Sequence, residues 1–238
     1  MKQKNPLAQL PLFAGTQGAV LDTLYSAGNV KQFASGGQIL RARVPAETVC
    51  ILLSGKAFTY SLTHTGHRKI TFIFGPGALL NDSTSGKTAS GSFCEAMGPC
   101  LVFCVPADAL LRCMKKDFGL AEAVLRAQER KLWRLEHQQK NSVHGLSLER
   151  KLAAKLWKLG RDFGVPVPGG TEIDLDLPVA FLADMLGAAR ETTSRLRGSL
   201  LRRGLLAMDG KRIVIPDPER LSRFYRSAGT PEDAGPVL

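Results

Sequence analysis

The sequence has no long hydrophobic run. No segment approaches the ~18 consecutive apolar residues that a membrane-spanning helix requires. The first residues, Met1–Pro6, lead into a short apolar patch that lacks the apolar core and cleavage site of a signal peptide. These absences predict a cytoplasmic protein with no membrane partner.

Disulfide and zinc-ligand patterns are missing as well. The cysteines form an odd set with no Cys-x-x-Cys pair, at Cys50, Cys94, Cys100, Cys104 and Cys113. We therefore expect neither a disulfide framework nor a zinc knuckle, and interpret these thiols as small buried hydrophobic side chains. A thiol sensor is the alternative, and no spacing in the sequence favours it.

Catalytic patterns are absent too. The sequence holds no nucleophile elbow, no phosphate-binding P-loop and no pair of carboxylates spaced for catalysis. A cupin-like metal enzyme, the alternative from another class, needs a His/Glu cluster on facing strands. Only His64 and His67 fall in the β-rich part of the chain, and they lie in one expected loop. We therefore predict a protein that is not an enzyme and has no metal site.

Basic residues are in excess. Lysine and arginine number 32 against 21 acidic residues, which gives a formal net charge of +11. Such a balance indicates an anionic partner such as nucleic acid, although charge alone does not decide the matter. A chain of 238 residues, 44% of them hydrophobic, is long enough for two domains with their own cores.

Residues 1–105 are expected to form an effector-sensing β domain. Short apolar runs recur between glycine-containing turns, as strands do. The clearest hairpin pairs Lys56–Leu62 with Arg68–Phe74, and both segments alternate between apolar and polar residues. Many short strands at this spacing predict a jelly-roll β-barrel.

Residues 106–145 are expected to form a dimerisation helix. Helical periodicity runs from about Pro106 to Val143, and Gly145 marks a hinge or boundary. Positions spaced as in a two-stranded coiled coil make homodimerisation the favoured interpretation, and a helix packed on its own domain is the alternative. The expected dimer seam consists of Phe118, Ala121, Leu125, Gln128, Leu132 and Leu135, with a polar end at Gln139 and Ser142.

Residues 146–238 are expected to form a winged helix-turn-helix domain. The Asp209-Gly210 dipeptide between two apolar runs is a strong signal for a hairpin, which would be the wing. The expected order is a helix from Leu146 to near Gly160, a turn-rich connector over 164–170, a strand over Thr171–Leu177, two short helices, a hairpin of Leu205–Met208 with Arg212–Ile215, and a final helix from Pro216. The fold class is therefore α+β.

The second short helix carries the expected DNA contacts. Leu182, Ala183 and Leu186 mark a first helix that stops at Gly187, a residue suited to a tight turn. The next helix would enter the major groove with Arg190, Glu191, Ser194 and Arg195 opposite the buried Leu196 and Leu200. Arginine matches the O6 and N7 acceptors of guanine, and glutamate accepts from the N4 amine of cytosine.

Basic and hydroxyl side chains around that helix suit phosphate contacts. The expected phosphate-binding residues are Thr192, Arg197, Arg202, Arg203, Lys211 and Arg212. A solvated amphipathic helix with an ion pair such as Glu191–Arg195 is the alternative. A hairpin following as a wing favours DNA binding over that alternative.

The run Leu182–Leu196, with its Arg-Glu-Thr-x-Ser-Arg motif, and the later Arg203-Gly204-Leu205-Leu206 and Ile213–Asp217 segments resemble the Crp–Fnr family of transcription regulators. The resemblance covers nearly the whole chain and implies a cyclic-nucleotide-binding-like β-roll, a dimerisation helix and a winged helix-turn-helix. It implies that Glu191, Ser194 and Arg195 are the main base readers of an inverted-repeat operator. RNA polymerase would be a further partner if the protein is an activator.

The resemblance also bears on the effector. The family's cyclic-nucleotide site has a glutamate and, some ten residues on, an arginine that holds the cyclic phosphate. Here Ala78 stands where the glutamate is expected, and no arginine lies between Arg68 and Arg112. We therefore expect no cyclic nucleotide, since a buried phosphate without a partner is unfavourable.

Iron–sulfur and haem cofactors are judged from their ligands. An N-terminal cysteine cluster for iron–sulfur is missing, because the first cysteine is Cys50. Haem stays open through His64, His67 and His137, so a haem- or redox-dependent regulator of the same family is the alternative.

A small organic anion is the effector that the charge pattern favours. Residues 1–105 hold nine basic and four acidic residues. The candidate pocket residues are Tyr60, Phe72, Phe74, Leu79, Leu80, Ser90, Arg126, Arg130 and Trp133, with Lys131 as a further cation. A solvated face of the helix is the alternative interpretation of these cations. Effector binding would shift the population between two arrangements of the recognition helices.

Overall fold

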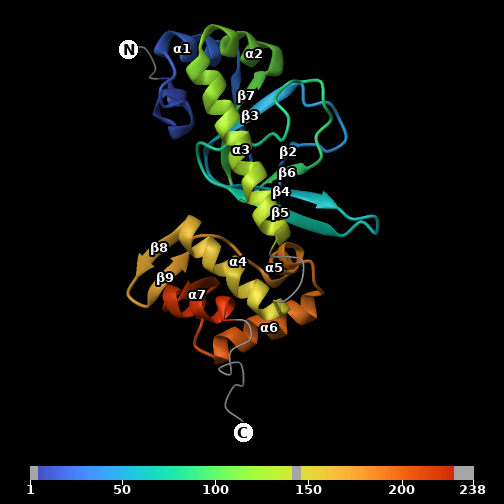
Figure 1. Cartoon of the computed structure of the whole chain (residues 1–238), viewed down its shortest axis with the longest axis vertical. Coiled ribbons are helices and arrows are strands. Elements are labelled where there is room, and N and C mark those ends of the chain that lie inside the picture. Colours follow the sequence, from blue (N-terminus) through green and yellow to red (C-terminus); the bar gives the residue numbers. More distant parts are fainter. Residues whose placement is uncertain (1–4, 141–145, 228–238) are drawn as a thin grey trace. The chain divides into compact units, whose positions relative to one another are not determined.

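The computed structural model describes residues 5–140 and 146–227, apart from the Lys140 side chain. The chain divides into two compact units, Met1–Glu136 and His137–Leu238 (Figure 1). Each unit has its own β-structure and its own buried hydrophobic side chains, so they are described in turn.

The first unit is built from two antiparallel sheets and three helices. The sheets have the strand orders β1-β7-β3 and β2-β6-β4-β5. The elements in chain order are two short 3-10 helices, η1 (Pro6–Gln9) and η2 (Pro11–Phe13), then α1 (Gly18–Ser26), β1 (Asn29–Phe33), β2 (Gln38–Leu40), β3 (Thr48–Ser54), β4 (Ala57–Leu62), β5 (Arg68–Phe74), β6 (Phe93–Ala96), β7 (Cys100–Pro106), α2 (Ala107–Lys116) and α3 (Phe118–Lys140). The expected hairpin of β4 and β5 is confirmed.

Alternation along β3 and β7 gives this unit two cores. On one face of these strands Val49, Ile51, Phe103 and Val105 pack against the helices. On the other face Cys50, Leu52, Val102 and Cys104 join side chains of the second sheet in the interior of the roll. Successive side chains of a strand point to opposite faces, so one strand pair serves both cores. Gly28 permits a close approach, since a Cβ there would lie 2.4 Å from the Phe103 ring.

The long helix of the expected dimerisation segment is broken. Instead of one continuous helix, α2 ends at Lys116 and α3 begins at Phe118. Asp117 between them has an extended backbone, with φ −139° and ψ 109°. Its buried carboxylate accepts hydrogen bonds from the Leu120 amide at 3.1 Å and the Gln17 amide at 2.8 Å. Asp117 therefore caps α3 and ties it to the start of α1.

The second unit is a small sheet with four helices. Its elements are α4 (Leu148–Phe163), β8 (Gly164–Val167), β9 (Gly170–Ile173), α5 (Val179–Leu186), α6 (Arg190–Arg202), β10 (Ala207–Asp209), β11 (Arg212–Ile215) and α7 (Pro218–Arg226). The strand order is β10-β11-β9-β8, and all neighbours are antiparallel. With the β-roll and long helix of the first unit, this confirms the α+β class.

Several expected boundaries in the second unit were wrong. The connector over 164–170 contains a strand, β8, because Pro166 is tolerated on an edge strand. Strand β9 ends at Ile173, well before Leu177. The wing turn lies at Gly210-Lys211, since Asp209 already pairs with Arg212, and Gly210 supplies a positive φ of 54°.

We expect Asp117→Ala to lower the free energy of unfolding, and Asp117→Asn to lower it less, since asparagine also caps helices. The Gln17 amide holds the pKa of Asp117 below its ordinary value. The charge therefore stabilises the fold above the ordinary pKa, and this contribution is lost as the pH falls through the lowered value. Urea unfolding at neutral and acid pH measures both effects. Equal unfolding midpoints for Asp117→Ala and the wild type would refute the capping role.

Candidate DNA-binding helix and effector site

A tight turn positions helix α6 after helix α5. Gly187 ends α5 in the left-handed region, with φ 73° and ψ 41°. Its amide donates to the Ala183 carbonyl at 2.7 Å, and the Ala188 amide donates to the same oxygen at 3.2 Å. A left-handed residue at this place favours glycine, so the expected role of Gly187 is confirmed.

The inner face of α6 is anchored by Thr193 and Leu200. Both side chains have 0% relative exposure. The Thr193 hydroxyl donates to the Ala189 carbonyl at 3.0 Å, so the buried oxygen has a partner while the methyl packs. Leu196 is half-buried, which makes it a weaker anchor than expected.

The outer face of α6 presents a compact set of polar side chains. Arg190, Glu191, Ser194 and Arg195 are all exposed. Their spacing of one, four and five positions puts them on one side of the first two turns of the helix. In the part of the chain that the structure describes, Glu191 and Arg195 form no ion pair with each other. These side chains are therefore available to an external partner.

The residues expected to contact phosphates have different surroundings. Arg202 and Lys211 are exposed, and Thr192 and Arg197 are half-buried. Arg203 pairs with Glu149 at 3.6 Å, and Arg212 pairs with Asp174 at 3.4 Å. The last two arginines therefore have a structural role within the second unit, which competes with any role toward phosphate.

A buried asparagine joins β3 to α3 in the first unit. The Asn81 side chain accepts from the Cys50 amide at 2.7 Å and donates to the Thr48 carbonyl at 2.9 Å. Its main-chain carbonyl accepts from Gln128 at 3.3 Å and from the Lys131 ammonium at 2.5 Å. The roll and the long helix therefore meet at one satisfied polar residue, which the sequence analysis did not identify.

The Lys131 side chain contributes a cation with a shifted pKa to this junction. Its Nζ lies 5.4 Å from the centre of the Phe74 ring. Burial lowers the pKa of Lys131 to about 8, and the nearby Asp82 carboxylate and the Cys94 thiol oppose that shift. The ammonium is thus held mainly by a carbonyl and a ring.

The residues expected to line the effector pocket lie in different parts of the first unit. Phe72, Phe74 and Leu80 belong to the interior of the roll, whereas Leu79 belongs to the helix-facing core. Ser90 is buried, and its hydroxyl donates to the Ser92 carbonyl at 2.8 Å. The candidate pocket residues therefore do not all lie on one face of the roll, because the strands alternate between faces.

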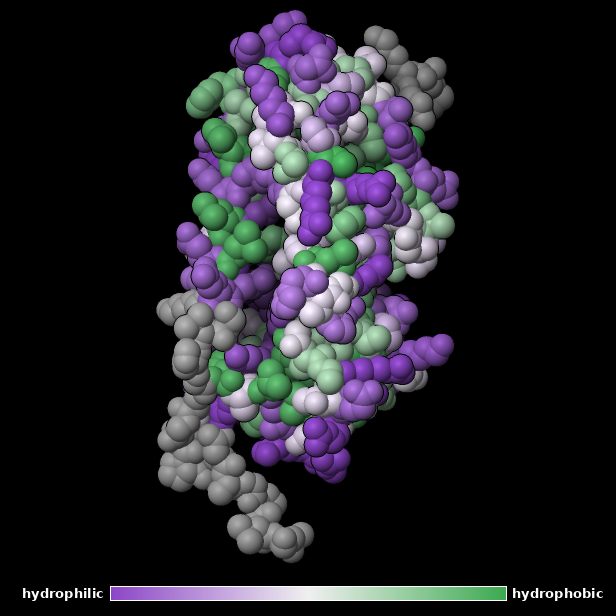
Figure 2. All heavy atoms as spheres, turned by 90° about the vertical axis from the view of Figure 1, so that its right-hand side faces the viewer, coloured by the Kyte–Doolittle hydropathy of each residue, from purple (hydrophilic) through white to green (hydrophobic). Residues whose placement is uncertain are grey.

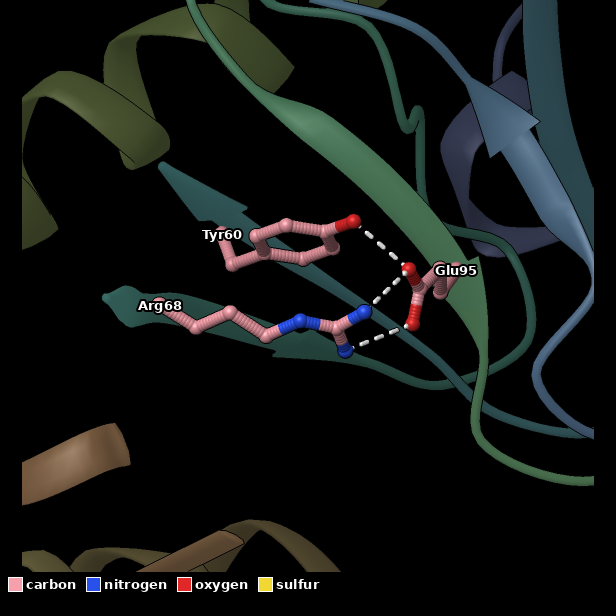
Figure 3. Close-up of polar contacts among 3 residues, drawn as sticks. All are labelled: Tyr60, Arg68 and Glu95. Carbon is pink, nitrogen blue, oxygen red and sulfur yellow. Dashed lines mark hydrogen bonds and ion pairs between the residues drawn. The ribbon is translucent and has the colours of Figure 1, made fainter. Parts of the chain in front are cut away.

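Tyr60 lies on the opposite face of its sheet from Phe72. Its hydroxyl donates to Glu95 at 2.6 Å. The Arg68 guanidinium donates two hydrogen bonds to the same carboxylate, at 3.0 and 3.1 Å (Figure 3). The Arg68 guanidinium also lies 4.5 Å from the centre of the Tyr60 ring. Burial, followed by the bond to Glu95, raises the pKa of Tyr60 to about 12. The charges of Arg68 and Glu95 thus neutralise each other within the cluster. The sequence analysis named Tyr60 as a site residue but did not identify Arg68 or Glu95.

Arg126, Arg130 and Trp133 do come together. They line a cavity of about 450 Å³ on α3, with Glu129 and Arg134. These residues lie on a side of α3 turned away from Lys131, since each residue of a helix is rotated by about 100° from the last. The expected effector residues therefore separate into a roll-side group at Lys131 and a cavity on the helix.

Other expectations concern cofactors and membranes. His64 and His67 lie in the exposed loop between β4 and β5. Among the described residues, no group of three or more metal-ligating side chains could hold a metal ion. No described helix is long and apolar enough to cross a membrane. Figure 2 shows hydrophilic side chains interspersed with hydrophobic ones on the face of the molecule that it displays.

Comparison with protein families gives a direct result for both units. Residues 150–224 match the Crp-like helix-turn-helix domain, and residues 30–117 match the cyclic nucleotide-binding domain. The chain belongs to the Crp–Fnr family. This Crp–Fnr protein is thus a DNA-binding transcription regulator with an effector-binding domain.

This Crp–Fnr regulator is similar to several curated proteins and solved structures. The global nitrogen regulator of Synechococcus elongatus is 29% identical over 203 residues, which are 82% of this chain and 89% of that protein. A CRP-like cAMP-activated global transcriptional regulator of Mycobacterium tuberculosis is 24% identical over 92% of this chain and 98% of its own. Among solved structures, FixK2 from Bradyrhizobium japonicum has a TM-score of 0.70 at 22% identity, covering 82% of this chain and 96% of that one. The structural likeness shows the fold.

Lys131 provides a pH-dependent prediction. The folded protein releases this proton near pH 8, whereas an unfolded lysine holds it to about pH 10.5. Between these values the unfolded state binds more protons, so the free energy of unfolding contributed by Lys131 rises with pH. We expect Lys131→Met to be more stable than the wild type by a margin that shrinks from pH 8 to pH 10. The exposed Lys116→Met is the control, and a margin that does not change with pH for Lys131→Met would contradict the assignment.

Proposed function

We propose that two copies of this chain bind an inverted-repeat operator, each through helix α6. The observation that carries the proposal is the exposed set Arg190, Glu191, Ser194 and Arg195 on a helix whose opposite face is buried. These side chains lie in the N-terminal turns, the part of a recognition helix that comes nearest to base edges. Arginine and glutamate can each read a base there, and Arg202 and Lys211 are exposed for phosphates.

The exposed apolar row of α3 supports a homodimer. Phe118 is 78% exposed, Leu125 54%, Leu132 59% and Leu135 42%. These residues, with the half-buried Ala121 and Gln128, follow the heptad spacing of a coiled-coil seam. A long helix gains free energy by burying such a row against a second copy. RNA polymerase would be a further partner if the regulator activates transcription.

Two arginine substitutions test the role of α6. We expect Arg195→Ala to reduce discrimination at one base pair by ~1–3 kcal/mol, because a bidentate contact to guanine would be lost. Arg202→Ala should weaken binding to all duplexes about equally and reduce the salt slope by ~1. Binding curves on the operator, on single-base variants and on random DNA at several salt concentrations measure both. Equal losses on operator and random DNA for Arg195→Ala would reject the base-reading role.

We further propose that the effector is a small organic anion that occupies the cavity on α3. Three arginines, Arg126, Arg130 and Arg134, line it against one carboxylate, Glu129. Arg126 already pairs with Glu122 at 2.5 Å, so Arg130 is the main candidate anchor. Trp133 offers an aromatic wall, and about 450 Å³ falls within the range of small-molecule sites. A cyclic nucleotide is disfavoured because no arginine lies between Arg68 and Arg112.

A thermal-shift screen of aryl carboxylates, chlorinated phenols, cyclic nucleotides and haem tests the effector. A ligand at a hundredfold excess over its Kd stabilises the folded protein by about 2.7 kcal/mol, which is a shift of several degrees. We expect an organic anion to give such a shift, and Arg130→Gln to abolish it while the exposed Arg112→Gln keeps it.

A second variant separates the two candidate places for the effector. Loss of the shift in Lys131→Gln, with Arg130→Gln unaffected, would move the effector to the roll-side group at Lys131. Stabilisation by haem or a cyclic nucleotide alone would overturn the proposal.

The proposed mechanism is a shift between two populations. An effector on α3 would favour one arrangement of the dimer seam, and with it one spacing of the two α6 helices. Only a spacing of about one DNA turn, ~34 Å, lets both helices occupy successive major grooves. The expected hinge at Gly145 and the end of the seam at Ser142 lie outside the described residues.

A further inference from the structure

We infer that Cys50 and Cys104 are a redox-active dithiol, which peroxide converts into a disulfide within the roll. The two sulfurs lie 3.6 Å apart on the neighbouring strands β3 and β7. All five cysteines are free and buried, so this contact is between thiols.

The backbone register is compatible with a bond between them. Cys50 and Cys104 are directly opposite each other in an antiparallel pair. The Cys50 amide donates to Asn81, and its carbonyl accepts from the Leu80 amide at 2.9 Å, so both groups point away from β7. The two cysteines therefore form a pair without mutual backbone hydrogen bonds, in which Cα atoms are closest, about 4.5 Å apart. That spacing lies within the range of disulfides, and the sulfurs need to approach from 3.6 Å to about 2.0 Å.

The two thiols differ in their surroundings on the sheet. Cys104 lies on β7 beside the exposed edge strand β1, whereas the other side of Cys50 is covered by Leu80 and Asn81. Either sulfur can donate the hydrogen bond between them. We therefore assign Cys104 as the thiol that reacts with an oxidant, in its thiolate form, and Cys50 as the thiol that resolves the product.

The reaction balances with hydrogen peroxide as the oxidant. The Cys104 thiolate attacks one peroxide oxygen, the O–O bond breaks, and the departing hydroxide takes a proton to become water. The Cys50 sulfur then attacks the Cys104 sulfenic acid, the S–O bond breaks, and a second water leaves. Two thiols thus lose two electrons and two protons, and peroxide is reduced to two waters. A dithiol reductant reverses the change by exchange.

Access to Cys104 comes through the edge of the sheet. Strand β7 lies between β3 and the short edge strand β1, whose side chains are mostly exposed. Cys104 pairs with Asn29 at the end of β1. Short edge strands open locally at low free-energy cost, and peroxide is close to water in size.

The disulfide would act on the junction with α3. The Cys50 amide is bonded to the Asn81 side chain, and the Asn81 carbonyl holds Lys131 and Gln128 of α3. A displacement of Cys50 toward β7 would therefore strain its hydrogen bond to Asn81, the residue to which α3 is attached. The pair is thus placed to convey an oxidation signal to the long helix.

Peptide mass spectrometry tests the pairing on the wild-type chain. After peroxide treatment, unreacted thiols are alkylated and the protein is digested with trypsin. Cys50 falls in the peptide 44–56 and Cys104 in the peptide 88–112, which also holds Cys94 and Cys100, so fragmentation must locate the linked sulfur. We expect a Cys50–Cys104 link that dithiothreitol removes. Linkage of Cys50 to Cys94 or Cys100, or full alkylation of all cysteines, would overturn the inference.

Matched variants test the roles and the coupling. Cys104→Ser should abolish the link, whereas Cys113→Ser should leave it intact, because Cys113 is buried in the other core. Amide hydrogen exchange in peptides of α3 should change on oxidation of the wild type and of Cys113→Ser, and not of Cys104→Ser. Unchanged exchange in α3 despite a complete disulfide would reject the coupling to the helix. These measurements use no DNA and no effector, so they stand apart from the proposals above.

Discussion

The buried amide of Asn81 is the interaction on which the first unit depends. Its side chain satisfies backbone groups of β3, and its own carbonyl receives two side chains from α3. In a core of low dielectric, an unpaired donor or acceptor is costly, so these bonds specify one position of the 78–81 segment against β3. That carbonyl is where Gln128 and Lys131 of the helix attach. Lys131 and the Cys50–Cys104 pair therefore share one structural element.

Helix α6 obeys a simpler constraint. Thr193 and Leu200 bury one side of α6, and Gly187 turns the chain into it. Once that side is buried, the helical period leaves Arg190, Glu191, Ser194 and Arg195 on the other. The exposed side chains of α6 are thus separate from the buried side chains that stabilise the second unit. Arg203 and Arg212 differ, since they form ion pairs within the unit.

The predictions that succeeded rest on local patterns. Helix α6, the turn before it and the β4–β5 hairpin were predicted because spacings within about a dozen residues specify them. The predictions that failed depend on contacts between distant segments. Asp117 breaks the long helix because its carboxylate meets Gln17, which lies a hundred residues earlier in the chain. Residues 164–167 form a strand because β9 is there to pair with them.

The candidate effector site shows the same difference between local patterns and contacts of distant segments. The sequence by itself determined the family and the helix-turn-helix of α5 and α6. It also determined the cluster of Arg126, Arg130 and Trp133, because residues three and four apart on a helix share a side. Only the tertiary structure decided that Tyr60 and Phe72 face opposite ways, and that Cys50 meets Cys104 from 54 residues away. Side chains on a sheet change face at every residue, so their neighbours follow from strand register. That register is set by pairing across the whole roll.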